Sequence, residues 1–433
     1  MVPEPAAGAL PSLGRMRRLL AGFPALRHRN FRLFVVGQGI SLIGYWMQSV
    51  AQGWLVYRLE GRPLDLGKVA CAGYLPILCL APFAGVVADR LPRRPVLLLT
   101  QSLLGLLALA LGVLVWTGAV TVPLVVLFAG GVGLVSALDV PTRQSFLVEM
   151  AGAEDLPNAI ALNSSIFNGA RLVGPALAGS LVAALGEAPC FFLNAASYAA
   201  VLAALALMRL PPVDRPRGAH PLDAGFLSGL RYVWGVPVLR NLLLLLGVVC
   251  GLGVQYNMLM PVFARTVLGT DAKGYGLLLT AGGVGSIAAA LQLAARRYSR
   301  AQHRRHLLAG LVTFALAVLG LAASRRLAFA LACQALAGYG MVRYLATTNT
   351  LLQLNVEDRY RGRMMGLHTV MFLGTQPLGS LVLGALAQRV GAPRAAVVSG
   401  GVSLAAAAWL GLRLRRVALR EREAAGRAAA PGA

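Results

Sequence analysis

The sequence predicts an all-α membrane protein with twelve transmembrane helices, arranged as two pseudo-symmetric six-helix halves. Of its 433 residues, 57% are hydrophobic and only 13% are charged, about half the charged share of a soluble domain. A soluble fold of this length needs far more polar surface to cover its core. Apolar runs long enough to span a bilayer, about 20 residues each, also recur along the chain.

The first elements are a cytoplasmic segment and the N-terminal six-helix half. Residues 1–30 contain neither the compact apolar core nor the small-residue cleavage site of a signal peptide, so we expect them to be retained inside the cell. The N-terminal half is predicted at 31–210. Its six apolar runs are 33–57, 66–88, 96–117, 121–141, 159–185 and 189–209.

A Pro-rich, basic linker at 211–238 leads to the second half. The second part of this linker predicts a short amphipathic helix lying at the membrane surface. The C-terminal half is predicted at 239–414, and a cytoplasmic tail at 415–433. The apolar runs of this half are 240–264, 275–295, 307–323, 327–352, 364–387 and 395–412.

The two halves resemble each other in sequence. AEDLPNAIALNSS near 153 has a counterpart in VEDRYRGRMMGLH near 356, and PALAGSLVAAL at 175–185 is echoed by PLGSLVLGAL at 377–386. Internal repeats of this kind are typical of transporters that bind cargo between two halves near the middle of the membrane.

The lysines and arginines predict the orientation. With both termini in the cytoplasm, 29 of the 40 basic residues fall on the inner side, nine fall on the outer side, and Arg171 and Arg343 lie within spans. Cytoplasmic loops are enriched in Lys and Arg, so we expect a multi-pass protein of the cell's inner membrane with both termini inside. The net charge of +24 then indicates contact with membrane lipid headgroups, and we expect no nucleic-acid partner.

Polar residues within the spans are candidates for substrate binding, because unpaired polar groups facing lipid are costly. Several recur at helical spacing on one face of the first, fifth and tenth spans, while those of the seventh span cannot all share a face. The alternative is that they form hydrogen bonds that hold the bundle together. The candidates are Tyr45, Gln48, Gln52, Asn168, Arg171, Gln255, Asn257, Tyr339 and Arg343.

The two arginines within the spans are the most informative of these residues. Arg171 lies roughly 18 Å, and Arg343 roughly 13 Å, from the predicted cytoplasmic end of its span. They could attract an anionic or hydrogen-bond-rich substrate, or form an internal lock to backbone carbonyls or to Asn163 and Asn168. No acidic residue lies deep inside a predicted span, only Asp139 toward a cytoplasmic end, so the spans offer no obvious carboxylate to carry protons.

GVVADRLPRRPVLL at 85–98 resembles the cytoplasmic loop signature of the major facilitator superfamily, with Pro92 in place of a glycine. The matching residues are Gly85, Asp89, Arg90, Arg93 and Arg94. NGARLVGPALAGS at 168–180 resembles the helix-five motif of the superfamily's exporters through Gly174, Pro175 and Gly179.

Longer stretches resemble the branch of this superfamily that contains enterobactin exporters and related efflux proteins. They include LDVPTRQSFLVEM at 138–150, FFLNAASYAAVLAAL at 191–205 and DRYRGRMMGL at 358–367. The resemblance implies a monomeric antiporter that exports a siderophore-like or drug-like small molecule by alternating access, driven by the proton gradient and needing no other cofactor. A lipid or lysolipid flippase of the same fold and a passive channel are the alternatives.

The charged loop also predicts a gate. Asp89, Arg90, Asp139 and Arg143 are expected to form an ionic latch that closes the cytoplasmic mouth in one state. The alternative is that the arginines of the loop, including Arg93 and Arg94, only anchor it on anionic lipid. We assign conformational roles also to a bend of the fifth span and to the basic link of the second half, through Gly174, Pro175, Arg361 and Arg363.

Other classes lack their motifs. GRPLDLGKV at 61–69 has one residue too many between its glycines and ends in Val69, so it is not a phosphate-binding loop. HRRH at 303–306 has no acid beside its histidines, and the five cysteines are scattered in apolar runs. We therefore expect no metal site and no enzyme.

Overall fold

The chain is helical throughout the part that the structure describes. The structure is a computed structural model that describes residues 23–209, 226–296 and 298–428, with the backbone alone at 81–90, 153, 226–227 and 414–428. These ranges contain helices and no strand. Eleven helical segments in them are long and apolar enough to cross a membrane. The predicted all-α membrane class is therefore confirmed.

The tenth predicted span is the one missing from these eleven segments. It forms α12 (Leu327–Asn355), a continuous helix of 29 residues, which is long enough to cross a bilayer at 1.5 Å per residue. Polar residues such as Gln334 and Arg343 lower its hydropathy. The count of twelve crossings thus stays a prediction.

The N-terminal bundle has five long helices preceded by a short 3-10 helix. α2 packs against both α5 and α6, and α4 packs against the same two helices. The elements are η1 (Pro24–Arg27), α2 (Arg29–Glu60), α3 (Pro63–Arg90), α4 (Arg93–Trp116), α5 (Val122–Leu185) and α6 (Ala188–Leu207).

α5 differs from the prediction of a separate cytoplasmic link between the fourth and fifth spans. Helical structure runs on through this segment and breaks at Gly152, whose φ of 73° is a left-handed conformation that glycine adopts at little cost. Arg143, which was predicted in the link, lies inside the helix before this bend. The prolines Pro141 and Pro157 also lie within α5, because neighbouring helices of a membrane bundle can compensate for their missing backbone hydrogen bonds.

The C-terminal bundle begins with a short helix and one irregular span. The short helix α7 (Phe226–Gly235) packs against α8 (Pro237–Val248) and α13 (Arg361–Leu373), and the ring of Tyr232 stacks on Tyr360 at a centroid distance of 4.0 Å. A helix thus occupies the predicted linker, and its position on a membrane surface stays a prediction. The irregular span consists of α8 (Pro237–Val248), the π-helix η2 (Val249–Gly253), the 3-10 helix η3 (Val254–Leu259), α9 (Met260–Val262) and the π-helix η4 (Phe263–Val267).

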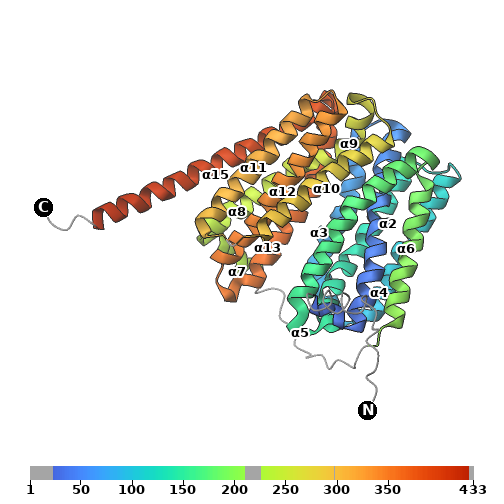
Figure 1. The fold of residues 1–433 in the computed structure, drawn as a ribbon, viewed down its shortest axis with the longest axis horizontal. Coiled ribbons are helices and arrows are strands. Elements are labelled where there is room, and N and C mark those ends of the chain that lie inside the picture. Colours follow the sequence, from blue (N-terminus) through green and yellow to red (C-terminus); the bar gives the residue numbers. More distant parts are fainter. Residues whose placement is uncertain (1–22, 210–225, 297, 429–433) are drawn as a thin grey trace, which may run out of the picture.

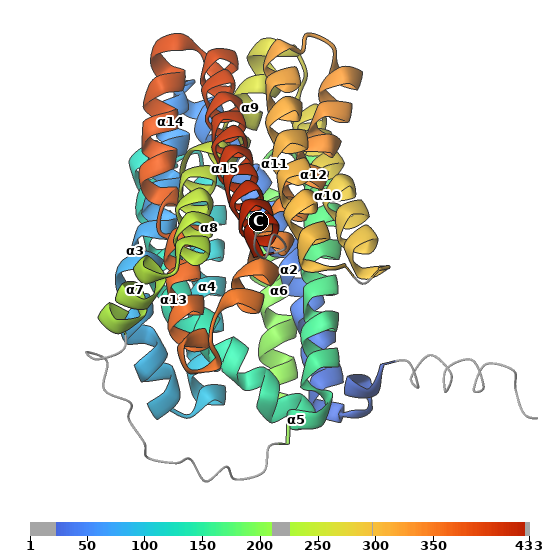
Figure 2. The ribbon, with the colours of Figure 1, turned by 90° about the vertical axis from the view of Figure 1, so that its left-hand side faces the viewer.

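More regular helices complete this bundle, and α12 lies between α10 and α11. Figure 2 shows the bundle from its outer side, with the end of α15 pointing toward the viewer. The elements besides α12 are α10 (Ala272–Ala294), α11 (Arg300–Ala323), η5 (Asp358–Tyr360), α13 (Arg361–Leu373), α14 (Gln376–Val390) and α15 (Ala392–Ala428).

The two bundles lie side by side and touch mainly at one end (Figure 1). α3 packs against α14, and α5 packs against α10. A Cβ atom added to Gly67 of α3 would lie 2.6 Å from the carbonyl oxygen of Ser380, and one added to Gly276 of α10 would lie 2.5 Å from that of Pro175. The opposite ends diverge, with α7 and α13 well apart from α4 and from the bend of α5.

Candidate functional site

Arg171 of α5 stacks on an aromatic side chain that sequence reasoning did not single out. Its guanidinium carbon lies 5.9 Å from the ring centroid of Trp46 on α2. The Trp46 ring also makes edge contacts with Tyr45 at 5.6 Å and with Phe167 at 5.7 Å. The structure thus places a cation on the Trp46 ring, and this ring contacts two more aromatic rings, one from α2 and one from α5.

Gly174 explains why α2 and α5 can approach so closely at this point. A Cβ atom at Gly174 would lie 2.5 Å from the Cβ atom of Trp46 and 3.2 Å from the carbonyl oxygen of Ile43. Any larger residue would push Trp46 away from Arg171. The structure therefore gives Gly174 a positioning role, in addition to the conformational role predicted for it with Pro175.

No carboxylate within the described ranges lies at ion-pair distance from Arg171. Its electrostatic neighbours include the hydroxyl groups of Tyr74 on α3 and Tyr256 on η3, so it lies where the two bundles face each other. The predicted contact with Asn168 is not formed, because Asn168 donates at 2.8 Å to the carbonyl of Ser164 in its own helix. Arg171 is thus a cation without a neutralising carboxylate among the described residues, and it lies between the two bundles.

The irregular seventh span contributes a second polar group. The Tyr256 hydroxyl donates to Gln334 Oε1 at 3.2 Å, and Gln334 Nε2 donates to Asn257 Oδ1 at 3.0 Å. Gln255 is buried and donates to the Cys250 carbonyl at 2.9 Å. Discontinuous membrane helices with π and 3-10 turns are common at substrate sites. The amide group of Gln255, however, donates to a backbone carbonyl of the same span.

The polar stripe predicted on the first span divides between two environments. Gln48 accepts a hydrogen bond from Asn194 of α6 at 2.6 Å, which ties two helices of the same bundle together. Tyr45 is 43% exposed, and Gln52 is half-buried. Of the three candidates on this helix, Tyr45 contacts the ring on which Arg171 lies, and its own electrostatic neighbour is Arg143.

Arg343 does not share a site with Arg171. Its Nε and Nη2 atoms lie 3.0 Å and 2.7 Å from Nδ1 of His306 on α11, and Tyr339 bonds to Gln292 of α10. Gln334, nine residues earlier and hence half a helical turn around α12, faces the seventh span instead. Arg343 and Tyr339 thus lie on the side of α12 that contacts α10 and α11, opposite to the side that carries Gln334.

We expect His306→Leu to lower the free energy of unfolding by about 1–2 kcal/mol, because the half-buried guanidinium of Arg343 loses its acceptor. His306→Gln retains an acceptor oxygen and should recover most of this loss. Thermal unfolding of the purified protein in detergent measures both values. Equal losses in the two variants would show that the Arg343–His306 contact does not stabilise the fold.

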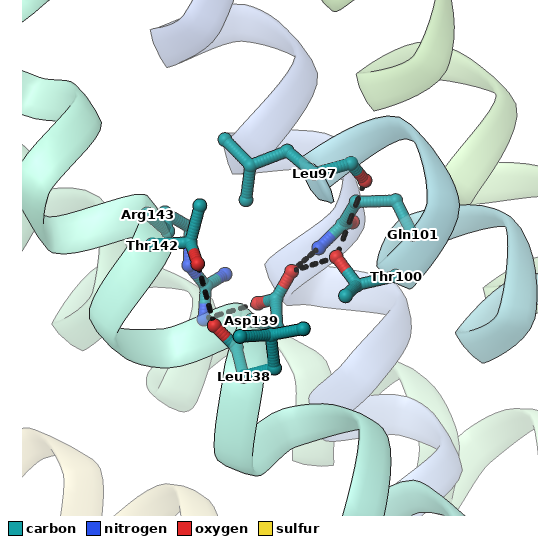
Figure 3. Close-up of polar contacts among 7 residues, drawn as sticks. All are labelled: Leu97, Thr100, Gln101, Leu138, Asp139, Thr142 and Arg143. Carbon is teal, nitrogen blue, oxygen red and sulfur yellow. Dashed lines mark hydrogen bonds and ion pairs between the residues drawn. The ribbon is translucent and has the colours of Figure 1, made fainter. Parts of the chain in front are cut away.

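Asp139 of α5 is the centre of a buried polar network (Figure 3). It is only 2% exposed and accepts hydrogen bonds from Thr100 at 2.8 Å and from Gln101 Nε2 at 2.7 Å. Its other oxygen lies 3.2 Å from Nη2 of Arg143, one turn further along α5. The predicted pairing of Asp139 with Arg143 is present, and the donors from α4 were not predicted.

The arginines that follow Asp89 and Arg90 in the charged loop contact the same bundle. Arg93 forms an ion pair with Glu149 at 2.6 Å, and Arg94 donates to the carbonyl of Ala206 at 2.8 Å. Both arginines therefore tie α4 to neighbouring helices of the same bundle. Gly85, Asp89 and Arg90 lie outside the residues whose side chains are described, so the latch role of Asp89 and Arg90 and the conformational role of Gly85 stay predictions.

The basic segment between α12 and α13, with the start of α13, contacts α7. Arg361 pairs with Asp358 at 2.6 Å, and the guanidinium of Arg363 lies 5.5 Å from the ring centroid of Tyr360. A Cβ atom at Gly229 of α7 would lie 2.8 Å from that of Arg363. Arg363 and Tyr360 thus lie against α7, whereas the pair of Arg361 is local and exposed. The gating role predicted for the two arginines is not tested by this geometry.

Known proteins share both sequence and fold with this chain. A sequence-family model described as transmembrane secretion effector matches residues 20–431. The chain is 28% identical over 365 residues to the "Multidrug efflux pump Tap" of Mycolicibacterium fortuitum, covering 82% of this chain and 87% of that protein. It is 27% identical over 376 residues to the "Staphyloferrin A transporter" of Staphylococcus aureus, with coverages of 85% and 92%. It is also 27% identical over 380 residues to the "Enterobactin exporter EntS" of Citrobacter koseri, with coverages of 86% and 89%.

Solved structures match over most of their length. A bacterial homologue of the human lysosomal transporter Spinster, in an inward-facing and occupied conformation, has a TM-score of 0.69 and 15% identity, covering 89% of this chain and 96% of that one. A bacterial homologue of the iron transporter ferroportin, in an inward-facing state, has a TM-score of 0.65 and 17% identity, covering 88% and 98%. At these identities the likeness shows a common fold.

Proposed function

Because the chain belongs to the transmembrane secretion effector family of the major facilitator superfamily, we propose that it exports a small molecule across the cytoplasmic membrane by alternating access, driven by the proton gradient. The chain is a multi-pass membrane transporter and not an enzyme. The names of the relatives described above refer to drug efflux and to siderophore transport or export. The cargo proposed for this chain is therefore a drug-like or siderophore-like small molecule.

The observation that carries this proposal is the unneutralised Arg171 between two bundles that meet at one end. A charged side chain at such a position is costly unless it faces water or a partner, so it marks a substrate pathway. Two bundles that pack through α3–α14 and α5–α10 at one end and diverge at the other have the geometry of one state of an alternating-access cycle.

The orientation inferred from the basic residues completes the proposal. It places the diverging ends of the bundles in the cytoplasm and the packed ends outside. In this arrangement cargo would enter from the cytoplasm and reach Arg171, and export would require the packed ends to separate. The proton gradient is the driving force that the family resemblance implies.

Inverted membrane vesicles test the proposed function. We expect siderophore or dye cargo to accumulate in vesicles that contain the protein, and an uncoupler to abolish this accumulation because no proton gradient remains. Vesicles from cells without the chain are the control. Accumulation that persists with the uncoupler would refute proton-driven export, equilibration without accumulation would indicate a channel, and movement of labelled lysolipid alone would indicate a flippase.

A further inference from the structure

We propose that Trp46 and Arg171 form the recognition site for a flat aromatic anion, which is the cargo class of this transporter. This inference rests on the proposed function, since it concerns the same central site. It assigns a specificity role to Trp46, and it excludes cationic cargo from this position.

The N–H groups of Trp46 and Arg171 have no acceptor within the part of the chain that the structure describes. Trp46 Nε1 is buried and has no hydrogen-bond partner within the part of the chain that the structure describes. Arg171 makes its cation–π contact with the Trp46 ring, and its N–H groups have no carboxylate to donate to within the described ranges. Buried donors are costly when unsatisfied, so the missing component is a ligand that brings acceptor oxygens.

The positive charge of Arg171 narrows the class of ligand further. A guanidinium binds a carboxylate through two parallel N–H···O bonds in its own plane, and this contact stays available when one of its faces lies on a ring. Arg143, the next cation of α5 toward the diverging end, lies within electrostatic reach of Tyr45. Arg143 is paired with Asp139 at 3.2 Å, so the unpaired Arg171 is the charge that favours an anion and repels a cationic dye.

The rings that contact Trp46 specify the body of the ligand. Tyr45 is 43% exposed and Phe167 is 41% exposed, and both touch Trp46. Large aromatic side chains that stay exposed around a ring on which an unpaired cation lies offer faces and edges for a flat aromatic ring. A saturated ring would lose these contacts, whereas an aromatic carboxylate or phenolate satisfies both the rings and the donors.

A purely structural role for the pair accounts for less of this geometry. Stacking of Arg171 on Trp46 would fix both side chains, but it would leave the buried Trp46 Nε1 without an acceptor. Gly174 also keeps the approach of α2 and α5 at the distance that this stack requires. A close approach that ends in unsatisfied donors is typical of a preorganised binding site.

Equilibrium binding to the full chain in lipid nanodiscs tests the proposal, with 2-naphthoate as the probe and titration calorimetry as the measurement. Two matched molecules each remove one feature: 2-naphthamide lacks the charge and decahydro-2-naphthoate lacks the aromatic rings. We expect each of them to bind at least about tenfold more weakly than 2-naphthoate. Equal affinity of all three molecules, or no binding of 2-naphthoate, would overturn the proposal.

Variants assign the binding to the two residues. Arg171→Gln should weaken 2-naphthoate binding by about thirtyfold or more, and Trp46→Leu by about tenfold. Arg171→Lys keeps the charge and Trp46→Phe keeps a ring, so these two variants test the site even if the first two fail to fold. Each of them should bind several-fold more weakly than wild type. Wild-type affinity in folded Arg171→Lys and Trp46→Phe proteins would refute the assignment.

Arg265→Gln is the matched control, because it removes an exposed arginine at η4 far from Arg171 along the chain. It should bind 2-naphthoate with the affinity of the wild type. A loss of affinity as large as that of Arg171→Gln would mean that only the net charge of the protein matters, and it would overturn the proposal. The outcome is distinguishable from that of the transport assay. If vesicles show no proton-driven export while 2-naphthoate binding depends on Arg171, the site stands and the proposed direction or driving force fails.

Discussion

Replacing Asp139 by alanine is expected to lower the free energy of unfolding by about 3 kcal/mol or more, because it breaks a buried ion pair on one side only. The carboxylate is 2% exposed and receives donors from Thr100 and Gln101 in addition to Arg143. Without it, the buried Gln101 amide would lose its acceptor, and the partly exposed Arg143 guanidinium would lose its counter-charge. Thermal unfolding in detergent measures the loss.

Asp358→Ala is the matched control for this prediction. Asp358 also pairs with an arginine, at 2.6 Å from Arg361, but its side chain is 88% exposed. An exposed pair of this kind contributes at most about 1 kcal/mol. If Asp139→Ala costs no more than Asp358→Ala, the buried network does not hold α4 to α5.

Asp139→Asn separates this structural role from the predicted gate. Asparagine keeps an acceptor oxygen for Thr100 or Gln101 but removes the charge opposite Arg143. A folded Asp139→Asn protein that binds cargo normally and transports it more slowly would support the latch. Normal transport by this variant would show that the Asp139–Arg143 pair serves stability alone.

The class of the fold followed from the sequence because the bilayer leaves few alternatives. Backbone polar groups in hydrocarbon must be satisfied internally, so each apolar run of sufficient length predicts a helix. The same rule could not place the bend of α5, because Gly152 is a single residue between two helical stretches. Nor could it predict the π and 3-10 turns of η2 and η3, since they depend on how the seventh span packs, for example where Ser399 donates to the Leu252 carbonyl at 2.8 Å.

The candidate site was only partly predictable, because helical periodicity shows which residues share a face but not what the face meets. Arg171 and Arg343 lie at comparable predicted depths, yet one stacks on Trp46 and the other bonds to His306. Trp46 is an uncharged aromatic residue off the polar stripe of Tyr45, Gln48 and Gln52, so helical periodicity did not select it. The signal that could have found it is Gly174, since a glycine within a helix-five motif indicates close approach of another helix.

Replacing Gly179 by leucine is expected to shift the protein away from the arrangement in which the bundles touch. A Cβ atom at Gly179 would lie 2.8 Å from the carbonyl oxygen of Ala272 and 3.0 Å from the Cα of Gly276. These neighbours are backbone atoms, which cannot move aside as a flexible side chain can. Overpacking of this kind costs about 1–3 kcal/mol, which corresponds to roughly a 5- to 150-fold change in the ratio of the two states.

The accessibility of Ser380 reports this shift. Its side chain is fully buried in the packed end, where its hydroxyl lies 3.3 Å from the Gly67 carbonyl. A cysteine at this position should react slowly with an impermeant maleimide in the otherwise native chain. It should react many times faster when Gly179→Leu is added. The labelling of the native cysteines is subtracted in both cases. Gly169→Leu is the control on the same helix, because a Cβ atom at Gly169 would meet nothing within 4 Å. Similar labelling in the Gly179→Leu and Gly169→Leu backgrounds would mean that contact between α5 and α10 does not close this end, since only the first substitution forces these two helices apart.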